Sequence, residues 1–237
     1  MSFLYHTFFF DPLYNVLALL FKILPWADAG VAVILLTILV RLIIFPLSRK
    51  AVLAQVRMAA IAPDLAQIKE RYKDSAEEQA KRTLALYKEK GVNPFSGIFV
   101  IIIQIPIIFA LYQIFLKFPA IDASILYSFV AAPEHINTAL LGFLDLTSKS
   151  VSLALLAAVS TFFQFQISAK SQTPPKGNSF SDNLTRSMQT QMKYFFPVIV
   201  FFISYNISGV IALYWLTTNL FSIGQELFIR RKLTKSS

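Results

Sequence analysis

Long apolar runs separated by polar segments make up most of this chain. A helix needs about 20 apolar residues to cross the hydrocarbon core of a membrane. Three runs are of this kind, at residues 27–47, 94–117 and 149–168. A fourth apolar region, 194–229, is long enough to cross twice if residues 206–209 form a turn. The pattern predicts an all-α polytopic membrane protein with five transmembrane helices, the last two at 194–207 and 208–229.

The N-terminal segment, residues 1–26, contains a shorter amphipathic stretch. Asp11 followed by Pro12 favours a helix start, and the apolar residues after it recur at helical spacing: Leu13, Val16, Leu17, Leu20, Phe21 and Leu24. About 14 residues are too few to span a bilayer, so we expect a helix lying in the outer membrane interface. A tail packed against the helical bundle is the alternative. We expect no secretory signal peptide, because a basic n-region and a cleavage site are not recognised.

Residues 48–93 form the longest polar segment. Apolar positions recur at helical intervals in two stretches, first Ile61, Leu65, Ile68 and Tyr72, then Ala80, Leu84 and Tyr87. Ser75 with Glu78 predicts a capped start for the second helix, and Gly91 predicts its end. We expect a cytoplasmic helical hairpin whose first arm is interrupted at Pro63. Its mixed charges either only fix the topology or also dock anionic lipids, RNA or another protein.

The distribution of basic residues predicts the orientation of the chain. There are 22 Lys and Arg against 13 Asp and Glu, a formal net charge of +9. Eighteen of the 22 lie in the hairpin, in the loop 169–193 and in the tail 230–237, whereas the extracytoplasmic loop 118–148 has none. Short cytoplasmic loops are enriched in Lys and Arg. We therefore expect an external N-terminus, a cytoplasmic C-terminus and a location in the bacterial plasma (inner) membrane.

Composition and motifs exclude several classes of function. Charged residues make up 15% of the chain, against about 25% in soluble domains, which argues against a soluble enzyme. The chain has no Cys and only two His, at positions 6 and 135, so neither a thiolate site nor a metal centre is expected. We recognise no nucleophile elbow and no phosphate-binding loop. We therefore expect no enzymatic activity and no cofactor.

Arg41 is the one charge expected deep inside an apolar span. An arginine near the centre of a membrane helix costs about 2.5–3.5 kcal/mol on insertion scales, and it keeps its charge. Glu226, the only acid in the region 194–229, lies near its cytoplasmic end, so an internal ion pair is not expected. We infer a water-filled cavity that leaves Arg41 available to an anionic group. The alternative is that Arg41 snorkels toward the interface marked by Pro46.

Other polar residues of the spans are candidates for the lining of this cavity. Thr37 lies one helical turn before Arg41, on the same face. The remaining candidates belong to the second, third and fifth spans: Gln104, Gln113, Gln164, Gln166, Tyr214, Trp215, Thr217, Thr218 and Asn219. For each glutamine, an interhelical hydrogen bond is the simpler interpretation.

Three stretches resemble the YidC/Oxa/Alb family of membrane-protein insertases: ILLTILVRLIIFPLSRKA (34–51), ALYKEKGVNPFSGIFVIIIQIPIIFALYQIF (85–115) and ALYWLTTNLFSIGQ (212–225). The resemblance implies a five-helix core that encloses a hydrophilic groove, open to the cytoplasm and the lipid but closed outside. It further implies a minimal five-span form, because the large periplasmic domain, the extra N-terminal span and the lipoprotein signal of other members are not recognised.

The resemblance also implies a function and its residues. Family members insert and fold nascent membrane proteins without hydrolysing a nucleotide. The groove arginine corresponds to Arg41 and its helix neighbour to Thr37, and the substrate-contacting aromatic residues correspond to Tyr214 and Trp215. Gln104 and Gln164 match polar positions of the core, and Thr218 completes the expected substrate-binding groove.

The expected partners follow from the same resemblance. The hairpin and the basic tail are similar to regions that meet nascent chains, the ribosome and components of the Sec translocon. Anionic lipids are expected at these basic segments, and DNA is not. The alternative function is a small-anion transporter that uses Arg41 as its binding charge.

Overall fold

The computed structural model describes residues 2–24, 28–93, 96–169 and 180–235. Most of these residues are helical, as the all-α prediction requires. The elements, in chain order, are α1 (Ser2–Tyr5), η1 (His6–Phe10), α2 (Asp11–Ile23), α3 (Ala29–Ala60), α4 (Ala62–Arg71), α5 (Ala76–Glu89), α6 (Ser96–Lys117), η2 (Ala123–Ile125), β1 (Ala139–Leu140), β2 (Leu144–Asp145), α7 (Val151–Ala169), α8 (Phe180–Ile207) and α9 (Gly209–Lys235).

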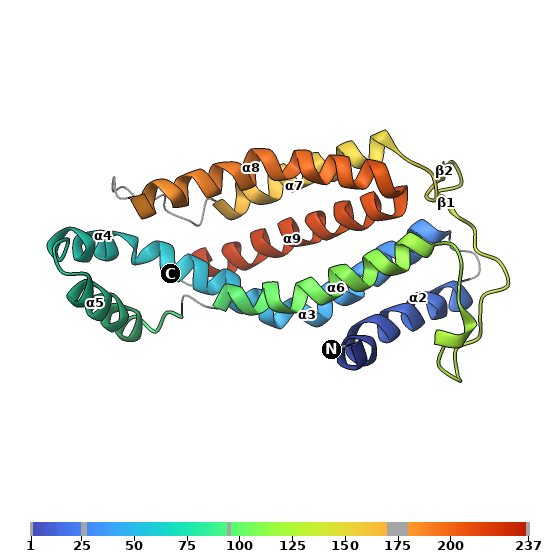
Figure 1. Ribbon diagram of the computed structural model, residues 1–237, viewed down its shortest axis with the longest axis horizontal. Helices are drawn as coiled ribbons and strands as arrows, with labels where there is room; N and C mark the ends of the chain where they lie inside the picture. The colour runs from blue at the N-terminus through green and yellow to red at the C-terminus, as the bar shows by residue number, and fades with distance from the viewer. Residues whose placement is uncertain (1, 25–27, 94–95, 170–179, 236–237) are drawn as a thin grey trace.

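The long helices run side by side along the length of the molecule (Figure 1). α3 packs against α6 and α9, and α7 packs against α9 and α8. Within the described part of the chain, α3 and α7 are the two helices long and apolar enough to cross a membrane. The helical fold and these two apolar helices are consistent with an all-α membrane protein.

The core is formed where α3 meets its neighbours. Its fully buried side chains include Val33 and Leu36 of α3, Leu111 of α6 and Val210 of α9. α2 packs on this core through one face, which buries Tyr14, Asn15 and Leu17, among others. Its opposite face is partly exposed. The predicted N-terminal helix thus lies against the bundle, as the alternative interpretation proposed.

α3 is longer than the sequence suggested. The expected first span, 27–47, ended where the polar segment begins, but the helix continues through Pro46 to Ala60. A proline inside a helix removes one backbone hydrogen bond and bends the helix, yet helix-forming residues on both sides allow it to continue. Residues 48–60 therefore belong to α3, and only the remainder of the expected hairpin segment forms α4 and α5.

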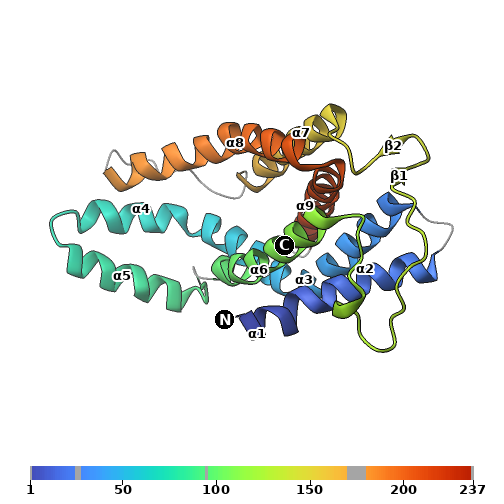
Figure 2. The ribbon, with the colours of Figure 1, turned by 45° about the vertical axis from the view of Figure 1, so that its right-hand side comes forward.

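α4 and α5 lie side by side beyond one end of the bundle (Figures 1 and 2). Pro63 stands in the first turn of α4, where its missing N–H costs no helical hydrogen bond. The Ser75 hydroxyl caps α5 by accepting a hydrogen bond from the Glu78 backbone N–H. Ile61, Leu86 and Val92 form a small apolar cluster that joins the two helices.

The C-terminal half also differs from the expected boundaries. Residues 180–193 were expected in a loop, but they form the first half of α8, while 170–179 lie outside the described residues. α8 and α9 are separated at Ser208, inside the segment where a turn was expected. The basic tail continues α9 to Lys235, and residues 236 and 237 are not described. α8 and α9 therefore both extend well beyond their apolar segments.

Candidate functional site

Arg41 lies in the middle of the apolar half of α3 and is partly buried. It is close enough to Tyr214 of α9 for the two side chains to interact electrostatically. Among the described residues, no hydrogen bond or ion pair involves its guanidinium. A buried cation is normally paired or hydrated. Arg41 is therefore a candidate for contact with water or with an anionic group.

Tyr214 is the centre of a small polar group between α6 and α9. Its ring is buried and lies against Phe115, with ring centroids 6.0 Å apart. The Gln104 side-chain amide donates to the Tyr214 hydroxyl across 3.5 Å, a long hydrogen bond. Thr218, one turn along α9, lies beside the same hydroxyl. The structure thus brings four of the expected groove residues together: Arg41, Gln104, Tyr214 and Thr218.

Two oxygen atoms of this polar group have no protein partner among the described residues. They are the Gln104 side-chain carbonyl and the Thr218 hydroxyl, both fully enclosed. Buried polar atoms in native proteins nearly always have a hydrogen-bond partner, either protein or water. These two atoms, like the Arg41 guanidinium, are therefore candidates for contact with water.

The other three expected groove residues are placed differently. The Thr37 side chain is buried, and its hydroxyl donates to the Val33 carbonyl of its own helix at 2.7 Å. Trp215 is partly buried at the margin of the core. Gln164 belongs to α7, which packs mainly against α8 and α9, and it is partly exposed. None of the three contributes a polar group to the Arg41–Tyr214 cluster through a described hydrogen bond.

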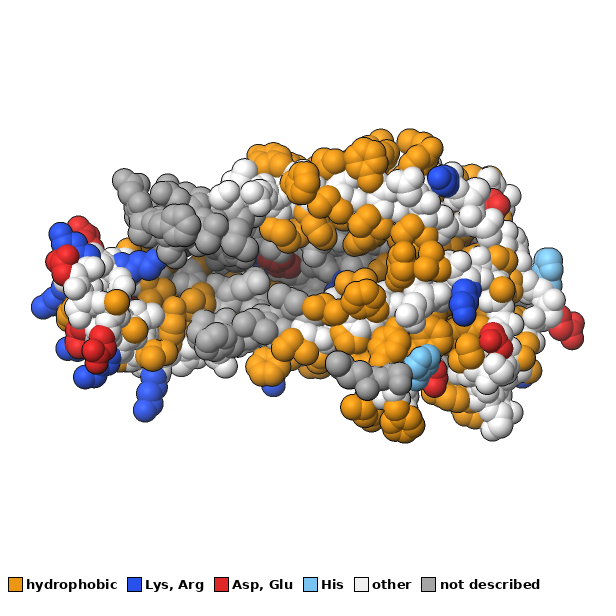
Figure 3. Space-filling view, in the orientation of Figure 1, with side chains coloured by type: hydrophobic (Ala, Val, Ile, Leu, Met, Phe, Trp, Pro, Cys, Tyr) orange, Lys and Arg blue, Asp and Glu red, His pale blue; other side chains and the backbone are white. Residues whose placement is uncertain are grey.

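A hollow in the molecular surface leads toward the interior of the bundle. α9 packs against both α3 and α7, with α6 on α3 and α8 on α7, so α6 and α8 lie on opposite sides of the bundle. Figure 3 shows the hollow between the apolar surfaces over α6 and α8, with acidic and basic atoms visible inside it. The outer faces of α6 and α8 expose large apolar side chains, such as Phe109 and Phe202. Charged groups therefore lie in a hollow that is bordered by apolar surface.

The segment 118–148 closes the end of the bundle at the start of α3 and α9. The Ala29 N–H donates to the Asn137 carbonyl at 2.8 Å, and the Gly209 N–H donates to the Ser148 carbonyl at 2.9 Å. Leu146 is completely buried, and its carbonyl accepts from the Val210 N–H at 3.1 Å. The first turns of both helices thus find hydrogen-bond partners in this segment.

At the opposite end of the bundle, polar side chains link α9 to α3 and to α7. The sequence did not predict these contacts. The Gln225 amide on α9 donates to the Ser48 hydroxyl on α3 at 2.6 Å. Glu226 is buried, forms an ion pair with Arg230, and accepts from the Ser168 hydroxyl on α7 at 2.6 Å. The only sequence signal for this cluster was the isolated acid in an apolar region.

Asn219 was expected to line the cavity, but it faces α7 instead. Its amide nitrogen lies 2.7 Å from the Thr161 hydroxyl and 2.9 Å from the Ser160 hydroxyl. This buried amide joins α9 to α7. Within the described residues, no three His, Asp or Glu side chains form a group that could hold a metal ion.

Comparisons with known proteins show which family this chain resembles. The family model described as "60Kd inner membrane protein" matches residues 19–236. A membrane protein insertase YidC from Wolinella succinogenes is 30% identical over 227 residues, which are 96% of this chain and 38% of that protein. The insertase YidC proteins of Pelobacter propionicus and Francisella tularensis subsp. novicida are 30% and 32% identical, over 85% of this chain each.

The matched region covers only part of those relatives. The chain spans 38%, 35% and 32% of the lengths of the three proteins. The family match, in contrast, extends over nearly the whole chain and includes α3, α6, α7, α8 and α9. On this basis, the chain belongs to the YidC/Oxa/Alb family.

Proposed function

We propose that this protein is a membrane-protein insertase that inserts and folds nascent membrane proteins through a hydrophilic groove bearing Arg41. The observation that carries the proposal is the partly buried guanidinium of Arg41, which interacts electrostatically with Tyr214 and has no ion-pair partner among the described residues. The names of the relatives support the activity. No nucleotide hydrolysis is needed, because the substrate itself supplies the driving force.

The proposed topology has five spans, formed by α3, α6, α7 and the apolar parts of α8 and α9. The N-terminus lies outside and the C-terminus lies in the cytoplasm, because Lys and Arg gather at α4, α5 and the end of α9. α4 and α5 then form the cytoplasmic hairpin, and the segment 118–148 lies outside. α2 lies at the outer interface, with one face on the bundle and the other toward the lipid head groups.

The groove acts by shortening the passage of polar segments through hydrocarbon. Water around Arg41 hydrates the polar tail of an arriving chain, and the permanent positive charge attracts acidic residues in that tail. The apolar flank of the substrate leaves sideways into lipid and gains about 0.8 kcal/mol per buried CH₂ group. An acidic tail that moves outward gains about 2.3 kcal/mol per charge for each 100 mV of membrane potential.

The segment 118–148 keeps the membrane sealed during this process. It satisfies the first backbone N–H groups of α3 and α9 and packs the buried Leu146 against the start of α9. A groove closed outside but open to lipid and cytoplasm favours lateral release of a polypeptide. The same closure argues against a small-anion transporter, which requires access to both sides of the membrane.

The proposed partners follow from the exposed segments. Nascent membrane proteins are the substrates, and the Sec translocon acts beside the protein for some of them. The ribosome docks at α4, α5 and the basic end of α9, where Arg71, Arg82 and Arg231, for example, provide positive charge. Anionic lipids bind at the same cytoplasmic face.

A photo-crosslinker placed at position 214 tests this assignment. We expect it to capture a ribosome-bound nascent membrane protein, because Tyr214 faces Arg41. The matched control is a crosslinker at position 219, since Asn219 is on the same helix but faces α7. The variants are also expected to restore growth to cells depleted of their own insertase. Equal capture at both positions, or no capture at 214, would contradict the groove.

A further inference from the structure

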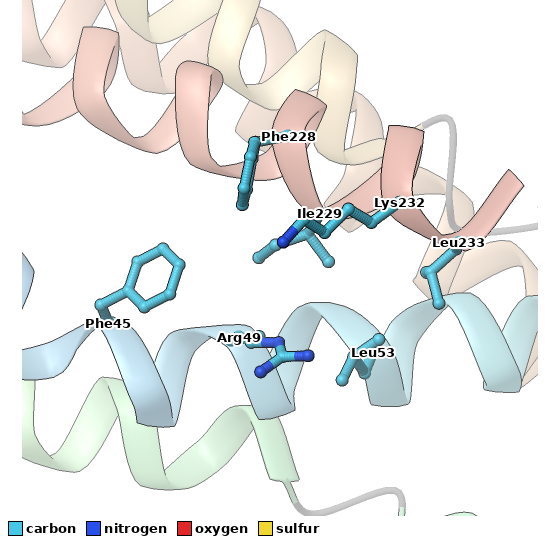
Figure 4. A pocket seen from close by; sticks show the side chains of 7 residues that line it. All are labelled: Phe45, Arg49, Leu53, Phe228, Ile229, Lys232 and Leu233. Atoms are coloured by element: carbon cyan, nitrogen blue, oxygen red, sulfur yellow. The ribbon is translucent and has the colours of Figure 1, made fainter. Parts of the chain in front are cut away.

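The two ends of the bundle differ in the kind of surface that they offer to a membrane. Near the basic end, Arg49 and Lys232 are among the residues that line a cavity of about 400 Å³ between α3 and α9 (Figure 4). At the other end, the segment 118–148 contains no Lys or Arg and has three acids. Any contact with lipid at this end therefore depends on apolar side chains rather than on ionic attraction.

The β1–β2 hairpin presents two apolar side chains at its tip. The strands pair Leu140 with Leu144, and a hydrogen bond from the Phe143 N–H to the Leu140 carbonyl closes the turn at 3.3 Å. In this turn, Leu141 is 69% exposed and Phe143 is 78% exposed. The tip is thus an apolar point that the rest of the described chain leaves largely uncovered.

The backbone of the tip favours polar residues or glycine, yet it contains a leucine. Leu141 has a φ of 53° and Gly142 a φ of 77°, as in hairpin turns with positive φ at both central residues. Asn, Asp and Gly adopt this conformation most readily and are also compatible with water. A leucine is strained there, and its exposed side chain gains little from packing inside the protein. An apolar environment outside the protein gives this side chain a role.

The hairpin is fastened to the first turn of α3. The Asp28 carboxylate accepts a hydrogen bond from the Leu141 N–H at 2.5 Å and another from the Val31 N–H at 2.9 Å, so it holds the tip and caps α3 together. The Leu140 side chain lies against Gly30, where an added Cβ atom would be 2.1 Å from Leu140 Cδ1. Figure 1 shows β1 and β2 level with the start of α3, while the neighbouring loops extend further out. These contacts fix the position of the tip relative to α3.

The start of α3 defines the depth of the tip in the membrane. The apolar run of α3 begins at Ala29, directly after Asp28, so the hydrocarbon core ends near this turn in the proposed topology. The polar interfacial layer of each leaflet is about 5–7 Å thick, which is about one turn of helix. A tip that is hydrogen-bonded to Asp28 therefore stands within the outer interfacial layer.

We propose that the β1–β2 hairpin is an outer-leaflet anchor, whose tip inserts Leu141 and Phe143 into the interfacial layer of the bilayer. Phe and Leu are side chains that interfacial elements bury at the boundary between head groups and acyl chains. Through Asp28, the anchor holds the start of α3 at a fixed depth. The binding partner is the lipid surface itself. It needs no anionic head group, because the hairpin carries an acid, Asp145, and no basic residue.

Site-directed spin labelling tests the anchor, since the chain has no Cys and an introduced Cys is the single site of labelling. Nitroxides are placed in three separate variants of the full chain, Phe143→Cys, Glu134→Cys and Leu155→Cys, in phosphatidylcholine vesicles. Oxygen concentrates in the bilayer and a nickel chelate stays in water, so the ratio of their collision rates with the label reports its depth. We expect this ratio at position 143 to be several-fold higher than at Glu134, an exposed residue of the same segment. It should approach the ratio at Leu155, which is exposed on the apolar helix α7.

The variant Leu141→Asn separates anchoring from folding. Asparagine adopts the positive φ of the turn more readily than leucine, so the melting temperature in detergent should be unchanged or higher. The tip loses apolar area, so the label at position 143 should move toward water and its collision ratio should fall toward that of Glu134→Cys. Replacing phosphatidylcholine by phosphatidylglycerol should leave the ratio at position 143 unchanged.

The proposal is overturned by equal ratios at positions 143 and 134, or by an unchanged ratio at position 143 in Leu141→Asn. Shielding that disappears when the protein is diluted in lipid would identify a second copy of the chain as the occupant instead. Shielding that requires phosphatidylglycerol would show that ionic attraction, not apolar insertion, holds the tip. Because the assay measures no insertion of substrate, its failure would leave the proposed function unaffected.

Discussion

Glu226 forms an ion pair with Arg230 one helical turn away on α9, and the pair is held against α7 by the Ser168 hydroxyl, 2.6 Å from the Glu226 carboxylate. The Arg230 guanidinium also donates to the Ile167 carbonyl at 2.9 Å. The only acid of the last apolar region therefore already has a cation of its own. Glu226 is thus engaged elsewhere, and Arg41 has no anionic partner among the described residues.

Replacing Glu226 by Gln should destabilise the bundle. The change removes the carboxylate that pairs with Arg230, and breaking a buried ion pair by removing one partner is costly. Since Arg230 is partly exposed, we expect a loss of about 2 kcal/mol rather than the full penalty. Thermal unfolding in detergent measures the effect. Glu78→Gln, which breaks the exposed pair with Arg82, is the control and should leave the melting temperature nearly unchanged.

Replacing Gly209 by Val should disturb the closed outer end. A Cβ atom at this position would lie 3.2 Å from Leu146 Cα and 3.3 Å from Leu146 O, and a backbone cannot easily yield. Overpacking of this kind costs about 1–3 kcal/mol. We expect a lower melting temperature and a faster ion leak through proteoliposomes that contain the variant.

Gly224→Ala on the same helix is the matched control for that change. A Cβ atom at Gly224 meets no other atom within 4 Å, and alanine favours a helix over glycine by about 1 kcal/mol. This variant should be as stable as the wild type or slightly more stable, with no added leak. A leak of equal size in both variants would show that the Leu146–Gly209 contact is not the seal.

The stability of the two-stranded β1–β2 hairpin should depend on pH through Asp145, which ends β2. Hydrogen bonds from the backbone N–H and the hydroxyl of Thr147 hold the pKa of Asp145 below its ordinary value of 3.8. A group whose pKa is depressed by folding stabilises the folded state above its ordinary pKa, and this contribution disappears as pH falls through the folded value. Melting temperatures of wild type and Asp145→Asn should therefore differ at pH 6 and converge below pH 3.8. A pH-independent difference would exclude this role.

Periodicity predicted much of the local structure, because each signal was contained in a few neighbouring residues. The Ser75 cap of α5 is an example. Asp11, in contrast, does not cap α2, because the chain is already helical through α1 and η1 and no side-chain cap hydrogen bond forms there. The length of α3 was not predictable in this way. Whether Pro46 ends or only bends a helix depends on packing with α6 and α9, which lie far away in sequence.

The candidate groove was also predictable only in part, because packing between distant segments decides which side chains face it. Arg41 stood out because a charge in an apolar run is costly. The direction of a polar side chain depends on the rotation of its helix, so Asn219 and Thr218 looked equivalent in sequence. In the structure, Asn219 joins α7 while Thr218 lies beside Tyr214. Likewise, the neighbouring residues in the sequence did not indicate that the Thr37 hydroxyl would donate to the Val33 carbonyl.

Insertion into proteoliposomes of a substrate with an acidic N-terminal tail tests the central role of Arg41 most directly. The wild type is compared with Arg41→Gln and Arg41→Lys, and a substrate with a neutral tail is the control. We expect Arg41→Gln to insert the acidic substrate about ten-fold more slowly, a loss of about 1.4 kcal/mol. Arg41→Lys should retain most of the activity, and the neutral substrate should be affected little. If Arg41→Lys fails as badly as Arg41→Gln, or if both substrates are slowed equally, attraction by the groove charge is not the mechanism.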